Sequence, residues 1–424
     1  MSEHNYEASS AYARHLDQKD ELRKFRSQFH FPDSKTDHPV LYFTGNSLGL
    51  QPLTTKHEVQ SVMNNWQTLA VKGHFQGEDP WIDYIEKIKP SMARVVGAQA
   101  DEVAIMNTLT VNLHLLMISF YRPSETRFKI LMEADAFPSD RYAIDSHVKS
   151  RGYDPHESVL LIHPREGEHL LREEDIMRVI EEKGDEIALV LLGGINYYTG
   201  QVMPMSKITE KAHQQGCMVG FDLAHCAGNI LLSLHDWNVD FAAWCNYKYL
   251  NSGPGSIASI FVHDRHHTSK NISRLEGWWG NARNTRFLME DEFDPAAGAE
   301  AWVVSTPPTL AIAPIKSSLA LFDEAGIATL RKKSVKLTGY LEFLVKSIAG
   351  NRIRIISPTD PSDRGCQLSL QVKNADRSLY EQLIARGVIV DWREPDVIRV
   401  APAPFYNSYT DVFLFYEILQ DLLT

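Results

Sequence analysis

The middle of the chain alternates short apolar segments with helical segments, and this alternation constrains the fold more than any other feature. The strand-like segments begin at Arg127, Glu186, Cys217 and Ser256. They carry apolar side chains almost without interruption, which is typical of strands buried on both faces of a sheet. The pattern therefore predicts an α/β fold, with a largely parallel sheet that helices cover on both sides.

The two ends of the chain follow other patterns. Residues from about Glu7 to Phe29 predict one polar helix, and beyond about Pro307 a long helix precedes a mixture of strands and a helix, with Arg399 on the last strand. A single core stops growing at ~250 to 300 residues, and this chain of 424 residues is longer. We therefore predict an N-terminal segment of residues 1–72, a large domain of residues 73–309 and a smaller α+β domain of residues 310–424.

Charge and cysteine content narrow the class of protein. The net charge is −11 and the acidic residues are spread along the chain, so no nucleic-acid-binding face is expected. The apolar stretches fall far short of the ~20 residues that span a bilayer. The cysteines form no CxxC pair, which indicates buried thiols in a reducing compartment; they are Cys217, Cys226, Cys245 and Cys366. We expect a cytoplasmic protein that binds neither nucleic acid nor a membrane.

Side chains suited to catalysis follow the predicted strands at the points where the strands end. Ligands of open parallel sheets bind at these carboxyl ends, so we expect the side chains to meet there. A helix that begins near Thr108 or Thr110 would add unpaired backbone N–H groups, which bind anions. The groups at the strand ends are Phe137, Ser139, Asp140, Asp222, His225, Tyr247 and Lys248.

This set of groups suits pyridoxal phosphate. The cofactor needs a lysine for its Schiff base, a carboxylate beside its pyridine nitrogen, an aromatic ring to stack on and amides for its phosphate. Taken alone, each residue has an ordinary interpretation: Lys248 as a solvated lysine, or Asp222 as a helix N-cap. Likewise, Phe137 alone would be a core residue and His225 a structural histidine. Their conjunction in this order favours the cofactor.

A histidine-rich segment, HDRHH at His263–His267, raises the question of a metal site. It follows a predicted strand in a charged loop, and no carboxylates stand at ligand spacing around it. We expect a solvated turn and predict no metal site.

Longer stretches resemble the kynureninases, a family of fold type I pyridoxal-phosphate enzymes. They run in the family's order from about Leu41 to Val412 and include YFTGNSLGLQP, MNTLTVNLHLL, FPSD, GFDLAHCAGN, CNYKYLNSGPG, GWWG, STPP and IRVAPAPFYNSYTDV. The resemblance implies an aminotransferase class V-like fold. Its large domain would hold a mostly parallel seven-stranded sheet, and the N-terminal segment would contribute to the small domain and to dimer contacts.

The resemblance also implies roles for individual residues. Lys248 would form the Schiff base, Asp222 would pair with the pyridine nitrogen, and Phe137 would cover the ring. His225 would lie near the phenolic oxygen, and Arg399 would hold the α-carboxylate of the substrate as a bidentate donor. The other implied cofactor contacts are Leu109, Thr110, Pro138, Ser139, Asp140, Tyr247, Trp278 and, from the partner subunit, Thr306. The implied substrate contacts are Asn46 and, at the aryl end of the pocket, His74, Ser305 and Thr306.

One position departs from the family pattern. Many members carry a hydroxyl residue where this chain has Gly193. A side-chain contact that the family makes at that position is therefore missing.

The implied reaction is hydrolytic cleavage of the Cβ–Cγ bond of L-kynurenine or 3-hydroxy-L-kynurenine. It yields anthranilate or 3-hydroxyanthranilate plus L-alanine, in tryptophan catabolism or NAD biosynthesis. Lys248, freed as an amine, would be the base, and Tyr247 is a candidate acid or base. Members that favour the 3-hydroxy substrate tend to carry a histidine at the position of His74. The family's shared sites imply a homodimer with active sites at the subunit interface.

Two other interpretations stay open. An aminotransferase or a cysteine desulfurase would share the scaffold, although Cys366 opens a strand-like segment, whereas a desulfurase needs a nucleophilic cysteine on a mobile loop. A catalytically silent relative would serve as a binding or scaffold protein. It would have no physical need for Lys248, Asp222 and Arg399 together.

Overall fold

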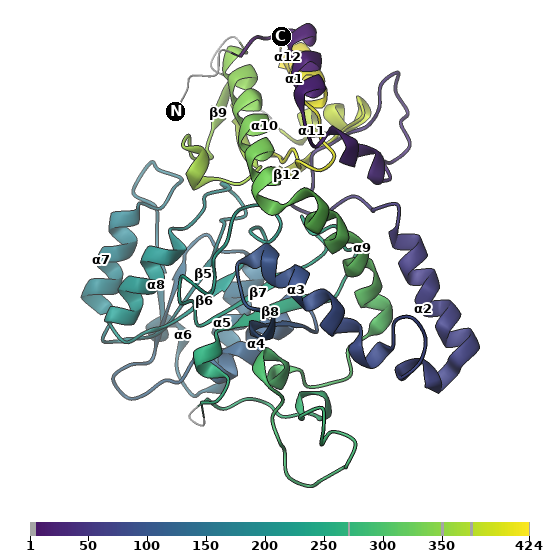
Figure 1. The fold of residues 1–424 in the computed structure, drawn as a ribbon. Coiled ribbons are helices and arrows are strands. Elements are labelled where there is room, and N and C mark those ends of the chain that lie inside the picture. Colours follow the sequence, from purple (N-terminus) through teal and green to yellow (C-terminus); the bar gives the residue numbers. More distant parts are fainter. Residues whose placement is uncertain (1–5, 270–271, 349–351, 374–375, 424) are drawn as a thin grey trace.

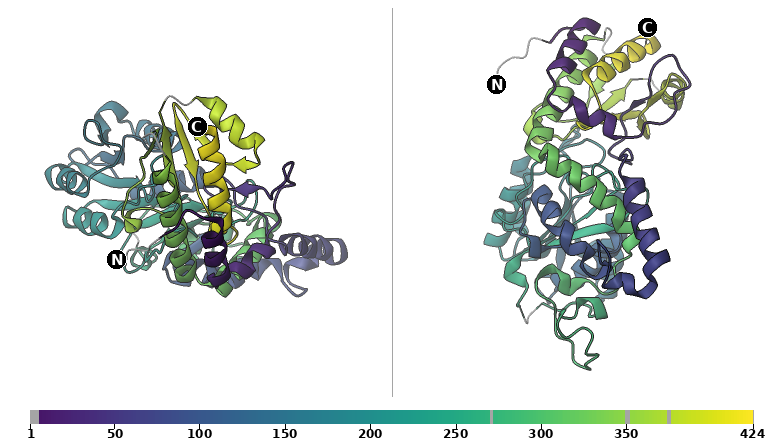
Figure 2. Two further views of the ribbon diagram at one scale, coloured as in Figure 1. Left: turned by 90° about the horizontal axis from the view of Figure 1, so that it is seen from above. Right: turned by 45° about the vertical axis from the view of Figure 1, so that its right-hand side comes forward.

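The computed structural model consists of a large part and a smaller part, which lies at the top of Figure 1. It describes residues 6–269, 272–348, 352–373 and 376–423. The first and last helices, α1 (Ser10–Lys19) and α12 (Tyr409–Leu423), lie side by side in the smaller part, as both views of Figure 2 show.

The large part is built on a seven-stranded sheet in the order β2-β8-β7-β6-β5-β3-β4. Neighbouring strands are parallel except at β8, which runs antiparallel to both β2 and β7. The strands are β2 (Val103–Ile105), β3 (Lys129–Glu133), β4 (Val159–Ile162), β5 (Ile187–Gly193), β6 (Met218–Asp222), β7 (Phe241–Cys245) and β8 (Ala258–Val262). The predicted α/β fold with a mostly parallel sheet is confirmed.

Helices cover both faces of this sheet, because alternate residues of each strand pack into two separate cores. In β5, Val190 and Leu192 belong to one core, whereas Leu189 and Leu191 belong to the other. The helices of the first core are α2 (Thr55–Leu69), α3 (Tyr84–Val96), α7 (Glu173–Lys183), α8 (Met205–Gln214) and α9 (Thr309–Ala325). Those of the second core are α4 (Leu109–Phe120) and α5 (Pro138–Ser150), and α6 (Pro155–Ser158) lies beside α5. Within the described ranges, no helix combines the length and the apolar character that crossing a membrane requires.

The smaller part contains an antiparallel sheet in the order β12-β13-β10-β9. Its core joins residues from both ends of the chain, since Ala13 and Phe43 pack with Leu341, Leu370 and Phe415. The two-residue strand β1 (Leu41–Tyr42) also pairs in parallel with β11 (Val388–Ile389). The remaining elements are α10 (Ile327–Ser347), β9 (Ile353–Ile355), β10 (Leu368–Val372), α11 (Arg377–Ala385), β12 (Asp391–Arg393) and β13 (Val397–Val400).

Two predicted helices are each divided. The prediction of one helix over Glu7–Phe29 is wrong, because α1 ends at Lys19 and a 3₁₀ helix, η1 (Arg23–Gln28), follows. At the break, the Asp20 carboxylate accepts the N–H of Leu22 at 2.9 Å, a local bond that competes with the helical one. The long helix beyond Pro307 is two helices, because Gly326 adopts φ 72° between α9 and α10.

Candidate active site

A cavity of about 350 Å³ lies where the carboxyl edge of the large sheet meets the smaller part of the molecule. The ends of β3, β5 and β6, the residues after β7, the first turns of α4 and α5, and strands β12 and β13 contribute to its walls. Most of the predicted site residues line it: Asn46, Leu109, Thr110, Phe137, Ser139, Asp140, Asp222, His225, Tyr247, Lys248 and Arg399.

Lys248 and His225 contact each other inside the cavity. They follow the neighbouring parallel strands β7 and β6, and Nζ of Lys248 lies 3.1 Å from Nε2 of His225. Burial lowers the pKa of His225 well below its ordinary value, and the adjacent Lys248 adds to the shift. The imidazole is therefore neutral at pH 7, and Nε2 can accept a hydrogen bond from the lysine amine.

Asp222 and Asp140 form a buried carboxyl pair. Burial raises the pKa of both groups, and the nearby charge of Asp222 raises that of Asp140 further, well above its ordinary value. Protonated Asp140 donates a hydrogen bond to Asp222, while Oδ1 of Asp222 accepts the Ala224 N–H at 2.7 Å. Asp222 is thus the member that stays ionised and can pair with a cationic ring nitrogen. Asp140 therefore donates its proton in a hydrogen bond to the Asp222 carboxylate.

The first turns of α4 and α5 meet at the cavity. Oγ1 of Thr110 lies 2.8 Å from Oγ of Ser139, which joins the two turns. In the described structure, no side chain caps the first N–H groups of either helix. Two uncapped helix N-termini on one cavity wall provide a binding site for a phosphate group.

Arg399 and Asn46 line the cavity, and each has a buried polar atom without a partner. Arg399 is 1% exposed; its Nη1 donates to the Tyr197 carbonyl at 2.7 Å, and its Nη2 pairs with Asp391. Within the described residues, Nε of Arg399 and Oδ1 of Asn46 are buried without a hydrogen-bond partner. Buried polar atoms normally find partners, and the Nε–H of Arg399 is a donor that fits a ligand with a carboxylate, whereas Oδ1 of Asn46 is an acceptor and fits a donor group.

Tyr247 and Phe137 complete the predicted lining. Burial raises the pKa of Tyr247, and its hydrogen bond with Cys245 adds to the shift, so the hydroxyl keeps its proton at neutral pH and can donate it. Phe137 stays 50% exposed, with its ring at 5.3 Å and 84° from that of Tyr197. A half-exposed aromatic face at the cavity mouth has room for a flat ring.

The remaining predicted residues do not line this cavity. Ser305 and Thr306 are exposed, and Trp278 donates its Nε1–H to the Arg286 carbonyl at 3.0 Å. His74 and Trp278 belong to an aromatic cluster with Phe75 and Phe287, in which the Phe75–Phe287 and Trp278–Phe287 centroids lie 5.7 and 5.4 Å apart. Pro138 opens α5 beside Phe137 and is exposed as well.

Several cavity residues were missed by the sequence analysis: Ser47, Glu133, Ile195, Tyr197 and Arg393. Glu133 is the most informative, because it is a buried carboxyl that follows the apolar residues Ile130–Met132 at the end of strand β3. A charged residue that ends an apolar strand at the ligand-binding edge is a signal that could have found it.

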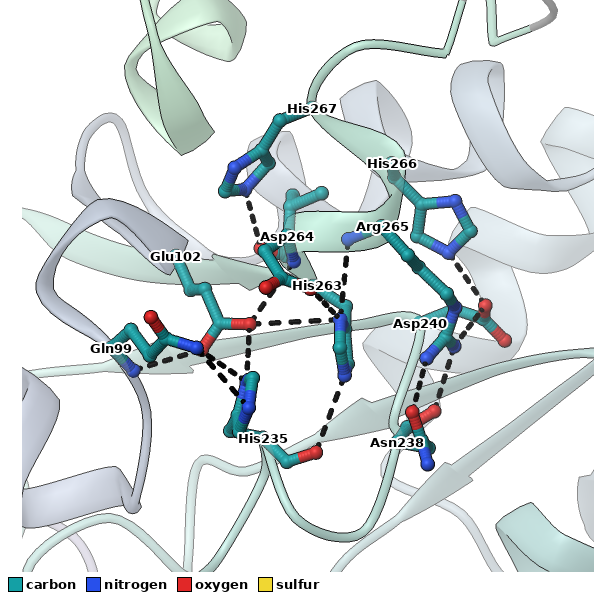
Figure 3. A network of polar contacts seen from close by, with 11 residues as sticks. Gln99, Glu102, His235, Asn238, Asp240, His263, Asp264, Arg265, His266 and His267 are labelled. Carbon is teal, nitrogen blue, oxygen red and sulfur yellow. Dashed lines mark hydrogen bonds and ion pairs between the residues drawn. The ribbon is translucent and has the colours of Figure 1, made fainter.

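The histidine segment differs from the expected solvated turn. His263 and His266 are buried, and Figure 3 shows their carboxylate partners. Oε1 of Glu102 lies 2.8 Å from Nδ1 of His235 and 3.6 Å from Nδ1 of His263, while Nε2 of His266 lies 2.7 Å from Asp240. Nδ1 of His263 also lies 2.7 Å from the adjacent Asp264, whereas Glu102 and Asp240 come from segments distant in sequence, so local spacing could not reveal those two. The hydrogen bonds tie the end of β8 to the rest of the large part.

Comparisons with known proteins agree on the family. Residues 330–419 match the family model described as the kynureninase C-terminal domain. A kynureninase of Myxococcus xanthus is 52% identical over 98% of this chain and 97% of its own length. A kynureninase of Flavobacterium psychrophilum is 51% identical over 96% of this chain and 97% of its own length.

Solved structures with the same fold are more distant in sequence. The cysteine desulfurase CsdA of Escherichia coli superposes with a TM-score of 0.75 at 15% identity, and the match covers 95% of this chain and 98% of that chain. A C-DES variant with glycine linked to its PLP cofactor gives a TM-score of 0.75 at 15% identity, over 90% of this chain and 96% of that chain. These matches show the fold alone. The two full-length relatives, with half of their residues in common with this chain, show that it belongs to the kynureninase family.

Proposed function

We propose that the chain hydrolyses the Cβ–Cγ bond of L-kynurenine or 3-hydroxy-L-kynurenine, with pyridoxal phosphate as cofactor. The products are anthranilate or 3-hydroxyanthranilate and L-alanine. The observation that carries the proposal is the cavity that brings Lys248, Asp222 and Arg399 together. An amine, a carboxylate and a guanidinium are the groups that an aldehyde cofactor, its ring nitrogen and the substrate carboxylate require.

The residues present fit the cofactor group by group. When bound, pyridoxal phosphate supplies an aldehyde for amines and a cationic ring that accepts electrons from the substrate. Asp222 holds the ring nitrogen in its protonated form, with protonated Asp140 as its hydrogen-bond donor. The first turns of α4 and α5, with Leu109, Thr110 and Ser139, bind the phosphate, and Phe137 covers the ring.

The chain's own groups then handle the substrate and its protons. Arg399 orients the substrate through its carboxylate and Asn46 offers an acceptor to the substrate, so that the α-proton faces Nζ of Lys248. Lys248 removes this proton as the base, and neutral His225 at 3.1 Å steadies the amine. Tyr247 keeps its proton at neutral pH, so it acts first as a donor. The proton goes to Cβ, which keeps the electron pair of the broken Cβ–Cγ bond, while the aryl part leaves as a carboxylic acid.

The aryl end of the pocket is completed by a second copy of the chain in this proposal. His74, Ser305 and Thr306 lie outside the cavity of their own chain, as does the predicted cofactor contact Trp278; His74 is half-buried and the other three are exposed. The aromatic cluster supports this, because Phe75 is 59% exposed and Phe287 is 45% exposed. Such apolar surface is usually covered in an assembly. We infer a homodimer in which each chain lends these residues to its partner's site.

The domain division is part of the same proposal. Residues 73–309 form the large domain that binds the cofactor, residues 310–424 contain the small domain, and residues 1–72 contribute to it, except that α2 and α9 pack in the core of the large part. The shared core of Ala13 and Phe43 with Leu341 and Phe415 supports this arrangement.

A cysteine desulfurase is disfavoured by the positions of the thiols. All four cysteines are buried, and burial raises the pKa of Cys366 to about 12. A reactive nucleophile would need to be accessible and easily ionised. The four unpaired thiols also support our proposal of a cytoplasmic protein, acting in tryptophan catabolism or NAD biosynthesis.

An anthranilate-fluorescence assay tests the function. Purified protein is given L-kynurenine, 3-hydroxy-L-kynurenine or L-cysteine, and aryl product and alanine are measured. We expect anthranilate and alanine in equal amounts from kynurenine and no alanine from cysteine. Cofactor-loaded protein that cleaves neither kynurenine substrate would overturn the proposal.

A further inference from the structure

Glu133 is a buried acid in the cavity wall that the mechanism above does not use. It ends β3, is 4% exposed, and lines both the active-site cavity and a neighbouring cavity of about 350 Å³. Nδ2 of Asn196 donates to its Oε2 at 3.2 Å, which holds the carboxyl in place. The other carboxyl oxygen, Oε1, points toward Gly193.

Gly193 leaves the space that this carboxyl occupies. It ends β5 and pairs in register with Asp222 on β6, so Glu133, Gly193 and Asp222 end three adjacent strands. A Cβ atom built on Gly193 would lie 2.9 Å from Oε1 of Glu133, closer than real Cβ contacts come. The Glu133 carboxyl therefore stands next to the place where a side chain at 193 would begin.

The surroundings of Glu133 make its charge depend on pH near neutrality. Burial raises its pKa to about 7, and the Asp135 and Asp222 carboxylates add to the shift, while hydrogen bonds from the Asn196 side chain and the Gly193 backbone oppose it. The carboxyl is thus mainly a hydrogen-bond donor at pH 6 and an anion at pH 8. The titratable and charged groups that face it across the two cavities are Asp135, Asp140, Glu168, His169, Asp222, His225, Lys248, Arg393 and Arg399.

We propose that Glu133 is a positioning residue for the cofactor, whose neutral carboxyl donates the hydrogen bond that no side chain at Gly193 can supply. The inference rests on the proposed function only for the identity of the cofactor, pyridoxal phosphate. With the ring nitrogen assigned to Asp222 and the phosphate to α4 and α5, the remaining polar group on the ring is its phenolic oxygen, which Glu133 would share with His225. A neutral acid stabilises that oxygen as an anion, whereas a carboxylate repels it.

Cofactor affinity at two pH values tests this inference without any substrate. Holoenzyme is dialysed to equilibrium against graded pyridoxal phosphate at pH 6 and pH 8, and bound cofactor is read from its absorbance. The amide of Glu133→Gln donates at both pH values. For each protein we compare Kd at pH 8 with Kd at pH 6. We expect this ratio to be about tenfold larger in the wild type than in Glu133→Gln, because one charge-assisted hydrogen bond of ~1.4 kcal/mol is lost only in the wild type. Other titrating groups contribute equally to both proteins.

Two further variants keep the test decisive. Glu168→Gln removes a half-buried carboxyl of the neighbouring cavity and should keep the wild-type ratio. Gly193→Ala should lower the ratio as Glu133→Gln does, because the alanine Cβ displaces the Glu133 carboxyl. This variant replaces Glu133→Gln in the test if Glu133→Gln fails to fold. Equal ratios in the wild type and in the folded variant would overturn the inference. Since no substrate is involved, protein that cleaves no kynurenine but shows the expected ratios would refute the proposed function alone.

Discussion

The two ends of the active site are built in different ways. At the cofactor end, Lys248, His225 and Asp222 come from the adjacent strands β6 and β7 of one chain and meet in one cavity. At the expected aryl end, His74 is half-buried and Thr306 is exposed, outside the cavity of their own chain. A parallel sheet edge can therefore position reactive groups within one chain, whereas in our proposal the wall that recognises the aryl group comes from a second chain.

The largest expected effect comes from the cofactor end. Lys248→Ala removes the amine that holds the cofactor and acts as the base, so kcat should fall by ~10³-fold or more. The purified wild type should be yellow, with an absorbance band that borohydride removes, and the variant should lack that band. A variant that kept the band and its response to borohydride would show that another residue holds the cofactor.

A smaller effect is expected where the substrate carboxylate binds. Arg399→Lys keeps the charge but loses the planar pair of donors, worth ~1.5 to 3 kcal/mol, so KM should rise by about 10- to 100-fold with a smaller change in kcat. Steady-state kinetics measures both constants. Arg386→Lys, at an exposed pair with Asp421, should change neither. An unchanged KM for Arg399→Lys would place the carboxylate elsewhere.

The buried cofactor end should also make folding depend on pH. Because the pKa of Glu133 is raised to about 7 in the folded chain, the folded state keeps a proton that the unfolded chain releases above about pH 4.5. The stability from this group is full below pH 4.5 and falls, by ~3 kcal/mol in total, as the pH rises to 7. Comparison of Tm between pH 5 and 7.5 should show a smaller fall in Glu133→Gln than in the wild type. Equal falls would mean that Glu133 has an ordinary pKa.

The smallest effect is expected at the aryl end. His74→Phe removes one hydrogen-bonding side chain, so kcat/KM should fall by about 2- to 10-fold more for 3-hydroxykynurenine than for kynurenine. The two substrates are assayed side by side with wild type and variant. Equal losses on both would remove the reason to connect His74 with the 3-hydroxyl group.

The cofactor end was predictable from the sequence because its signals are local. Lys248, Asp222 and Phe137 each follow an apolar strand, and the fold class requires the carboxyl ends of parallel strands to meet. Arg399 was found only through the family resemblance, since nothing in its own strand indicates that the smaller part faces the cavity.

Other features could not be predicted, because their partners are far apart in the chain. The space beside Gly193 is visible only once β3 and β5 are adjacent, and only then does Glu133 become a member of the site. Similarly, Glu102 and His235 contact His263 from separate segments of the chain. The segment that we expected to be a solvated loop is therefore part of a buried network. The division of the N-terminal helix depended on one side-chain bond of Asp20.

Mixing two inactive variants tests most directly whether the two ends of the site come from different chains. Lys248→Ala destroys the cofactor end, and Thr306→Trp blocks the aryl end of the partner's site. Co-expressed with different tags and purified as mixed dimers, the pair forms one intact site, so kynurenine cleavage should return although each variant alone is inactive. Mixed dimers that form but stay inactive would contradict the account.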